Sequence, residues 1–298
     1  MNSRRLYDLV ASRLMLLATF LLGMIVIVIA AVLLYRSLPI LEIKPLTELL
    51  LSSSWSPSKG DFGFYPFIMG TIWVTAIAMA IAIPLSLLTS IYIAEYAPSR
   101  LRNMLKPMVE LLAGIPSVVF GLWGVLVIVP LVRDFVAPAA GVTTTGYNLL
   151  SGGIILAIMV FPIIISVSEE VMRTVPREIH EASTTLGATR WQTVKSVVLR
   201  STLPGIAAAV VLGFGRAFGE TMAVLMVVGN VPKVPSSVFD PAYPIPALIA
   251  NNYGEMMSIP LYDSALLFSA LILLVSVVIF SMLAEVIISR FKRRYAIE

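Results

Sequence analysis

Long apolar runs separated by short polar segments dominate this chain. A helix that crosses a bilayer needs about 20 apolar residues, and the chain holds six runs of that kind. Backbone polar groups in hydrocarbon must be satisfied within their own segment, so each run is predicted to be a helix. The predicted spans cover residues 14–35, 67–95, 107–132, 149–168, 204–229 and 263–289. The predicted fold class is therefore all-α, a polytopic membrane protein with six transmembrane helices.

Composition supports the membrane class and excludes several kinds of chemistry. The 298 residues are 58% hydrophobic and 13% charged, with a mean hydropathy of +0.94, which is more apolar than a soluble domain requires. Cysteine is absent and His180 is the single histidine, so disulfides, a His/Cys metal site and a Ser-His-Asp triad are excluded. The sequence also lacks a GxxxxGK[ST] nucleotide loop and a discernible catalytic set. We expect no enzyme activity in this chain and no cofactor.

The positive charges predict how the chain is oriented. Fifteen of its 21 Lys and Arg residues fall on one side of the predicted spans, five on the other, and Arg216 lies within a span. By the positive-inside rule the richer side is cytoplasmic, and six spans place both termini there. The expected location is the cytoplasmic (inner) membrane, and the basic pI of 9.4 needs no nucleic-acid partner. The first run ends without a small-residue cleavage site and is expected to be a retained anchor.

Two longer loops fall on the external side. Residues 36–66 carry aromatic side chains suited to the membrane interface: Trp55, Phe62, Phe64 and Tyr65. Residues 231–262 hold six prolines, which exclude a long regular helix and predict a stiff loop. Three roles are expected alternatives for this loop: gating of a pathway, contact with an external partner, or simple connection of two spans.

The polar segment Glu181–Pro204 interrupts the apolar pattern on the cytoplasmic side. Pro176 is suited to open a helix, Gly187 to turn the chain, and Thr189 to cap a second helix. Two short helices around a glycine form a rigid projection, and small residues allow another surface to approach. The segment predicts a docking unit, with a solvated linker as the alternative.

Its spacing resembles the EAA loop of bacterial ABC-importer permeases. Glu181-Ala182-Ser183 is followed by Gly187 and then by Val197-x-Leu199. The match departs at Ser183, where alanine is usual, and at Arg200, where proline is usual. The resemblance implies a coupling helix that sits in a groove of a cytoplasmic ATP-binding subunit. The residues that it assigns to this contact are Glu181, Ala182, Ser183, Gly187 and Ala188.

The fifth predicted span contains two charges. Arg216 lies 12 residues past the predicted start, which is about 18 Å at 1.5 Å per residue. A charge at that depth costs about 2.5–3.5 kcal/mol on insertion scales and is not expected to face lipid. Glu220 follows at i,i+4 and is one possible partner, with Glu110 another. Arg216 either lies on the path of an anion or fixes the helix through an ion pair. Gly215 and Gly219 form a GxxxG pair that permits tight helix packing.

Two further blocks closely resemble the phosphate-specific ABC permeases of the PstC type. They are Gly213–Val224 and Glu110–Gly124, and the resemblance extends from about Tyr65 to the C-terminus. It implies the type I ABC importer permease fold and assigns Arg216 and Glu220 to phosphate movement. Pro116 interrupts the third span, where broken helices of transporters often line a cavity, so the neighbouring Ser117 hydroxyl is a further pathway candidate. A packing kink is the alternative for Pro116 and for Pro84 in the second span.

The expected organisation follows from these assignments. Residues 1–66 form an anchor helix and external loop, 67–289 the permease core with the coupling loop 176–204, and 290–298 a cytoplasmic tail. The resemblance implies a phosphate importer that works by alternating access. Its other parts are two cytoplasmic ATP-binding subunits, a second PstA-like permease and an external phosphate-binding protein. Transport of molybdate or sulfate, or a membrane signalling or scaffold role, are the alternatives.

Overall fold

The structure, a computed structural model, describes residues 3–254 and 259–295 and is helical apart from one short hairpin. Within these residues six helical stretches are long and apolar enough to cross a membrane, which confirms the predicted number. These stretches are Val10–Ile43, Tyr65–Tyr96, Ser117–Ala139, Leu149–Arg173, Arg190–Gly219 and Tyr262–Val286.

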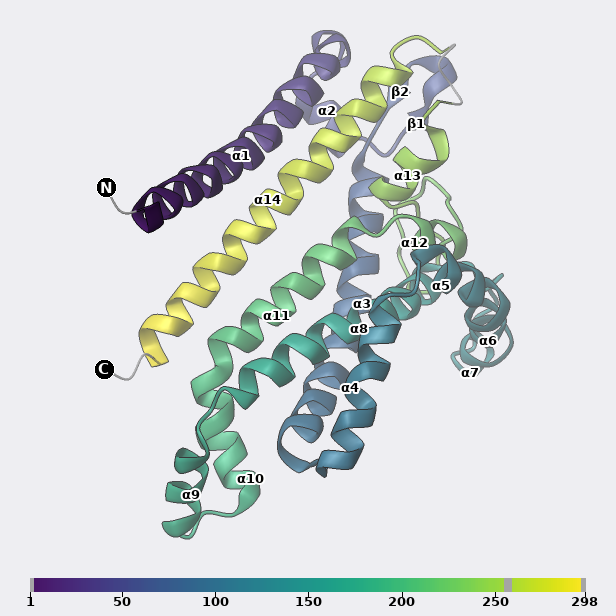
Figure 1. The fold of residues 1–298 in the computed structure, drawn as a ribbon. Coiled ribbons are helices and arrows are strands. Elements are labelled where there is room, and N and C mark those ends of the chain that lie inside the picture. The colour runs from purple at the N-terminus through teal and green to yellow at the C-terminus, as the bar shows by residue number, and fades with distance from the viewer. Residues whose placement is uncertain (1–2, 255–258, 296–298) are drawn as a thin grey trace.

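Three helices form the centre of the bundle and two cover one side of it (Figure 1). Helix α8 (Leu149–Arg173) packs on both α3 (Tyr65–Ile91) and α11 (Leu199–Gly219). Helix α14 (Tyr262–Tyr295) packs on α11, and α1 (Ser3–Ile43) runs antiparallel beside α14. Helix α14 includes most of the predicted tail, and residues 296–298 lie outside the described part of the chain.

The central helices make close contact through small and β-branched side chains. Val74 and Ala78 of α3 are buried against Val160 and Ile164 of α8. On α11, a β-carbon placed at Gly213 would lie 2.7 Å from Ile164 Cγ1. Only glycine fits there without displacing α8, so this position fixes the crossing of α8 and α11.

The predicted third span, 107–132, is wrong at its start. Residues 99–113 form a separate amphipathic helix, α4 (Ser99–Ala113). The chain breaks over Gly114–Pro116, because a proline there supplies no backbone N–H. The span begins after this break and includes α5 (Ser117–Trp123), η3 (Gly124–Ile128), α6 (Val129–Leu131), η4 (Val132–Val136) and α7 (Ala137–Ala139). Pro84, in contrast, lies within an unbroken α3.

The predicted fifth span, 204–229, is wrong at both ends. Helical structure already begins at Arg190, and α11 ends at Gly219. Glu220 is extended, with φ −71° and ψ 128°, and a short helix α12 (Met222–Val227) follows. The Glu220 carboxylate accepts hydrogen bonds from the backbone N–H groups of Thr221 at 3.1 Å and Ala223 at 3.4 Å. The side chain thus caps α12, which stabilises the break.

Residues 46–62 form a small ordered cap at one end of the bundle. Strands β1 and β2 pair antiparallel with Trp55 opposite Phe62, and they follow the short helix α2. Phe62 and Phe64 are buried, and the ring of Trp55 lies 4.7 Å from that of Phe67. These aromatic side chains therefore pack on one another edge to face, and their position at the membrane interface stays a prediction. The bounds of this cap are α2 (Leu46–Leu51), β1 (Trp55–Ser56), η1 (Pro57–Lys59) and β2 (Asp61–Phe62).

The described residues of the proline-rich loop 231–262 hold one short helix, α13 (Ile245–Asn252). Upstream of it the loop is non-helical and lies over the start of α8, where Leu149 N–H donates to Asp240 O at 3.0 Å. The prediction that this loop contains no long regular helix is confirmed for its described residues.

Candidate functional site: a projecting helix pair and a broken helix

A pair of short helices projects from the bundle beyond α8 and before α11. Helix α9 (Arg177–Thr185) follows Pro176, and α10 (Arg190–Thr193) leads through η5 (Val194–Val198) into α11. Residues 176–198 are called the α9–α10 unit below. Gly187 turns the chain with φ +84°, a conformation that glycine adopts without steric cost.

The N-terminus of α10 is held by a capping box. The Thr189 hydroxyl accepts from Gln192 N–H at 3.3 Å, and the Gln192 side chain accepts from Thr189 N–H at 2.8 Å. A second link joins the two helices, since the hydroxyls of Ser183 and Thr193 lie 2.9 Å apart. The predicted helix–Gly–helix unit is confirmed, and these internal hydrogen bonds stabilise its conformation.

The α9–α10 unit is also attached to the C-terminal end of the second span. That end is the π-helical turn η2 (Tyr92–Tyr96). His180 Nε2 lies 3.2 Å from Glu95 Oε2, and Arg190 donates to the Glu95 backbone carbonyl. The Arg190 guanidinium lies over the Tyr96 ring, 4.7 Å from its centroid. The unit is therefore linked to α3 through η2, in addition to its chain connections to α8 and α11.

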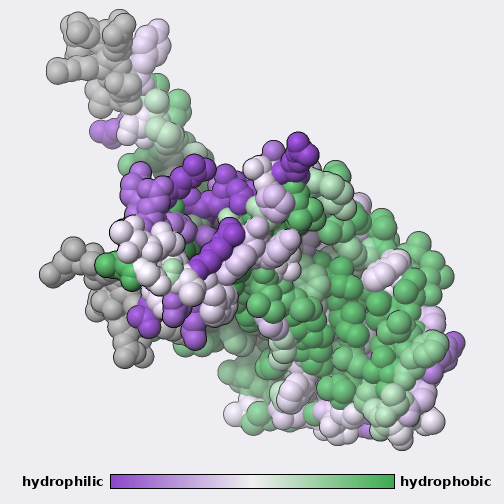
Figure 2. Space-filling view, turned by 90° about the horizontal axis from the view of Figure 1, so that it is seen from below, coloured by the Kyte–Doolittle hydropathy of each residue, from purple (hydrophilic) through white to green (hydrophobic). Residues whose placement is uncertain are grey.

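The outer surface of the unit is exposed and carries apolar side chains. Leu186, at the turn, is 89% exposed, and Trp191 and Ile179 are exposed beside it. Figure 2 views the molecule from this end and shows polar residues gathered there, with hydrophobic residues over the flanks. Exposed apolar side chains in a polar surface are typical of a protein-binding site.

The residues assigned by sequence to the coupling contact do not all share that surface. Glu181, Ala182 and Gly187 are exposed, whereas Ala188 is half-buried and the half-buried Ser183 hydroxyl faces Thr193. Sequence reasoning missed Glu95 and Tyr96, which anchor the unit. Their position at the end of the second span was the only available signal.

The break between α11 and α12 places two charges at helix ends. Arg216 lies in the last turn of α11, where the negative end of the helix dipole favours a cation. Glu220 lies at the start of α12, where the positive end favours its carboxylate. No ion pair joins Arg216 to Glu220 or to Glu110 in the part of the chain that the structure describes. The helix ends before Glu220, so the i,i+4 geometry is absent.

Arg216 lies on a face of α11 that the described residues leave exposed. Gly219 is also exposed, whereas Gly215 lines the space between α11 and α14, and a β-carbon at either glycine would meet no atom within 4 Å. The expected close-packed seam at this GxxxG pair is therefore not formed within the chain. In the described residues the Arg216 side chain has no hydrogen-bond or ion-pair partner.

The two helix breaks are brought together. A β-carbon at Gly121 of α5 would lie 3.1 Å from Ala223 Cα of α12, and one at Gly124 would lie 2.9 Å from Val227 Cγ1. The two helices therefore run parallel. Ser117 and Glu220 each lie about one turn before this contact. The half-buried Ser117 thus lies at the same end of the helix pair as the charged break.

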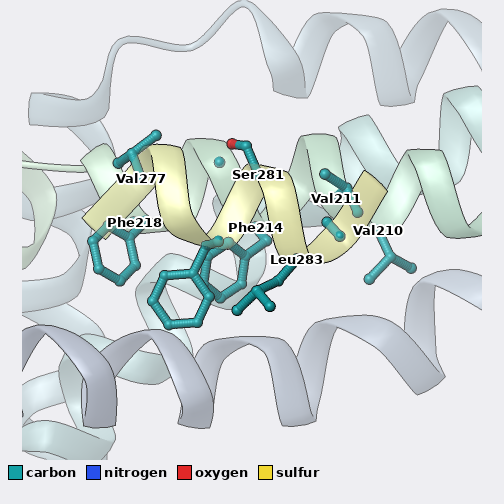
Figure 3. A pocket seen from close by; sticks show the side chains of 10 residues that line it. Val210, Val211, Phe214, Phe218, Val277, Ser281 and Leu283 are labelled. Atoms are coloured by element: carbon teal, nitrogen blue, oxygen red, sulfur yellow. The ribbon is translucent and has the colours of Figure 1, made fainter. Parts of the chain in front are cut away.

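An apolar cavity of about 300 Å³ lies between α11 and α14 (Figure 3). Phe214 and Phe218 of α11 line it together with Val277 and Phe280 of α14, and Ser281 supplies its hydroxyl-bearing side chain. Such a lining offers no charged partner for an anion. The apolar cavity is therefore not suited to bind an anion, in contrast to the adjacent Arg216.

Comparison with known proteins identifies relatives along most of the chain. Residues 82–295 match the family described as "Binding-protein-dependent transport system inner membrane component". The probable ABC transporter permease protein YqgH of Bacillus subtilis is 40% identical over 247 residues, covering 82% of this chain and 78% of YqgH. The phosphate transport system permease protein PstC of Xylella fastidiosa strain 9a5c is 37% identical, covering 82% of this chain and 79% of that protein.

Solved structures show the same fold at low sequence identity. A bacterial ABC transporter that imports the acidic polysaccharide alginate aligns with a TM-score of 0.62 and 16% identity over 96% of this chain and 99% of its own. The inward-facing MetNI methionine ABC transporter aligns with a TM-score of 0.58 and 18% identity over 76% and 97%. The predicted type I ABC importer permease fold is confirmed. The chain belongs to the family of inner membrane components of binding-protein-dependent transport systems and is a multi-pass membrane protein.

Proposed function

We propose that this chain is the PstC-like permease subunit of an ATP-driven phosphate importer, forming one half of the translocation pathway. The observation that carries the proposal is the exposed Arg216 at the end of α11, on a face that the chain leaves open. An uncompensated guanidinium at membrane depth is costly unless an aqueous path or a second subunit covers it. The PstC proteins among its relatives are named for phosphate transport, which supports phosphate as the cargo.

The chemistry of the break suits a tetrahedral oxyanion. The Arg216 guanidinium presents a planar set of N–H donors that binds phosphate-like oxygens in pairs. Glu220 is held on the α12 backbone rather than on Arg216, so it leaves the guanidinium available. Ser117, at the same end of the α5–α12 pair, contributes a hydroxyl. The acidic Glu220 keeps the site weak, which suits a pathway that must release its cargo.

The α9–α10 unit couples this pathway to ATP hydrolysis in separate subunits. Leu186 and the exposed residues Glu181, Ala182 and Gly187 dock into a groove of a cytoplasmic ATP-binding subunit. Closure of two such subunits moves the unit, and its links to α3, α8 and α11 tilt those helices between inward-open and outward-open states. No ATPase activity resides in this chain.

The remaining partners complete the pathway. A second, PstA-like permease covers the open face of α11, and an external phosphate-binding protein delivers the cargo. Both termini are cytoplasmic, as the distribution of Lys and Arg predicts. We also propose the earlier division into residues 1–66, 67–289 and 290–298 as the functional organisation.

Uptake of labelled anions tests the proposal. Deleting the gene for this chain is expected to abolish high-affinity uptake of labelled phosphate and to leave molybdate and sulfate uptake unchanged. Loss of molybdate or sulfate uptake instead would assign a different oxyanion. Unchanged uptake of all three anions would favour a signalling or scaffold role. Restoring the intact gene is the control.

A further inference from the structure

A second concentration of positive charge lies at the root of the α9–α10 unit. A polar cavity of about 250 Å³ opens there between η2, the end of α8, the start of α4 and the start of α9. Its polar lining comes from all four elements: Glu95, Arg102, Arg173, Arg177 and His180. It lies on the α9–α10 side of the bundle, away from the Arg216 face of α11.

The hydrogen bonds of the three arginines leave donors free. Arg102 is fixed in place, since its Nε donates to Ile93 O at 2.9 Å and its Nη2 to Ala94 O at 3.0 Å. Arg173 Nη1 donates to the buried Glu169 at 3.4 Å. Arg177 makes no hydrogen bond or ion pair with any residue that the structure describes. Free guanidinium groups beside one another repel unless an anion lies between them.

The nearby carboxylates do not neutralise this charge. Glu95 faces His180 at 3.2 Å, and Glu169 is shared between Arg173 and Lys106, the latter at 3.9 Å. Three guanidinium groups and Lys106 therefore face two carboxylates, which leaves a net positive site. Arg177 is the first residue of α9, so the positive end of that helix dipole adds to the potential.

We propose that this cavity is a cytoplasmic binding site for a phosphate-type oxyanion, held between Arg173 and Arg177 with Arg102 behind them. The cavity volume lies below the roughly 300–1,000 Å³ of sites for drug-sized ligands, so it suits a phosphate group and not a nucleotide. The source of that group is either inorganic phosphate in the cytoplasm or the headgroup of an anionic lipid. The choice of inorganic phosphate as the occupant rests on the proposed function. The existence of an anion site rests only on the cavity and its arginines.

Occupancy of this site would restrain the coupling movement. The cavity walls belong to η2, α4, α8 and α9, so an anion bound to Arg102, Arg173 and Arg177 joins the start of α9 to both α4 and the end of α8. A unit held in this way moves less when the ATP-binding subunits close. An importer with such a site would slow down as its product accumulates inside the cell.

The test measures binding of labelled inorganic phosphate to the purified transporter complex in nanodiscs. One set of discs contains phosphatidylcholine alone and the other contains phosphatidylglycerol as well. All variants carry Arg216→Gln, which removes phosphate binding in the translocation pathway. The test variant adds R173Q and R177Q, and the control adds R200Q, which removes an arginine from an exposed position on α11 outside the cavity. Sites on the ATP-binding subunits contribute equally to every variant.

We expect R173Q/R177Q to weaken phosphate binding in phosphatidylcholine discs at least about tenfold, with R200Q unchanged. Binding that persists with phosphatidylglycerol identifies free phosphate as the occupant, whereas binding that phosphatidylglycerol abolishes identifies the lipid headgroup. Equal binding by R173Q/R177Q and R200Q, or no binding beyond the ATP-binding subunits, would overturn the site. Phosphate uptake by the complex with Arg216 intact reports on the proposed function independently.

Discussion

The α9–α10 unit and the break at Glu220 are both polar interruptions in an apolar chain, but their polar groups are satisfied differently. In the α9–α10 unit, Thr189 is capped by Gln192, Ser183 faces Thr193, and His180 faces Glu95. At the break, Glu220 is bonded to local backbone, while Arg216 has no partner in the described residues. The hydrogen bonds that hold the two helices of the first region together are complete within the described residues, whereas the Arg216 guanidinium of the second region has no partner there.

This difference matches the two proposed roles. The α9–α10 unit transmits movement, whereas the surface around Arg216 binds cargo and contacts a second subunit. A unit that transmits movement has to keep its conformation, so the hydrogen bonds between the helices of the α9–α10 unit form before any partner docks. A pathway must leave donors unoccupied in order to bind and release cargo. Substitutions that affect one region and leave the other unchanged therefore test this difference.

The largest effect is expected at the incomplete region. Arg216→Gln should lower phosphate uptake about 10- to 100-fold, because hydrogen bonds to a charged group contribute roughly 1.5–3 kcal/mol. Uptake of labelled phosphate by cells measures the loss, and co-purification of the other subunits measures assembly. Assembly should be retained, since Arg216 makes no hydrogen bond or ion pair with the described residues and its replacement leaves the fold of this chain unchanged.

Two controls sharpen this result. Arg200→Gln removes the same charge from an exposed position on the same helix and should leave uptake intact. Arg216→Lys keeps the charge but loses the paired donors, and it should retain part of the activity. Normal uptake by Arg216→Gln would remove Arg216 from the pathway and leave it a structural role only.

A somewhat smaller effect is expected at the self-contained region. Gly187→Val forces a β-branched residue into φ +84°, which costs about 1–3 kcal/mol. The turn would rearrange and displace Leu186 from the docking surface. The expected outcome is several-fold less co-purified ATP-binding subunit and a matching fall in uptake.

Gly187→Asn is the matched control, because asparagine tolerates the left-handed conformation better than other non-glycine residues. It should retain most of the association and most of the uptake. Equal loss in both variants would mean that the glycine is needed for space against the partner and not for its backbone conformation. Unchanged association in Gly187→Val would contradict the docking assignment.

The sequence predicted the α9–α10 unit better than it predicted the pathway helix. Proline, glycine and threonine act on their own backbone, so Pro176, Gly187 and Thr189 marked the ends of the short helices directly. The anchor at Glu95 and Tyr96 depends on contact between residues about 85–95 positions apart, for which one sequence carries no pattern.

The end of α11 was mispredicted for a different reason. Hydropathy stays high through Met222–Val227, so the apolar run conceals the break at Glu220. The break depends on a side chain bonding the next helix, which competes with the i,i+4 ion pair that helical spacing would allow. Likewise, the apolar residues after Pro116 continue those of α4, so the third span was placed ten residues too early.

The smallest effect, and the closest comparison, comes from two glycines on opposite faces of α11. Gly213 faces α8, where a β-carbon would lie 2.7 Å from Ile164 Cγ1, while the same atom at Gly215 meets nothing within 4 Å. Gly213→Val should overpack the bundle by about 1–3 kcal/mol and reduce the amount of folded chain in the membrane. Gly215→Val should leave that amount unchanged, because the added side chain enters the open space between α11 and α14. If membrane fractions contained as little folded Gly215→Val chain as folded Gly213→Val chain, the space beside Gly215 would be filled in the folded protein, and the contrast between the two faces of α11 would fail.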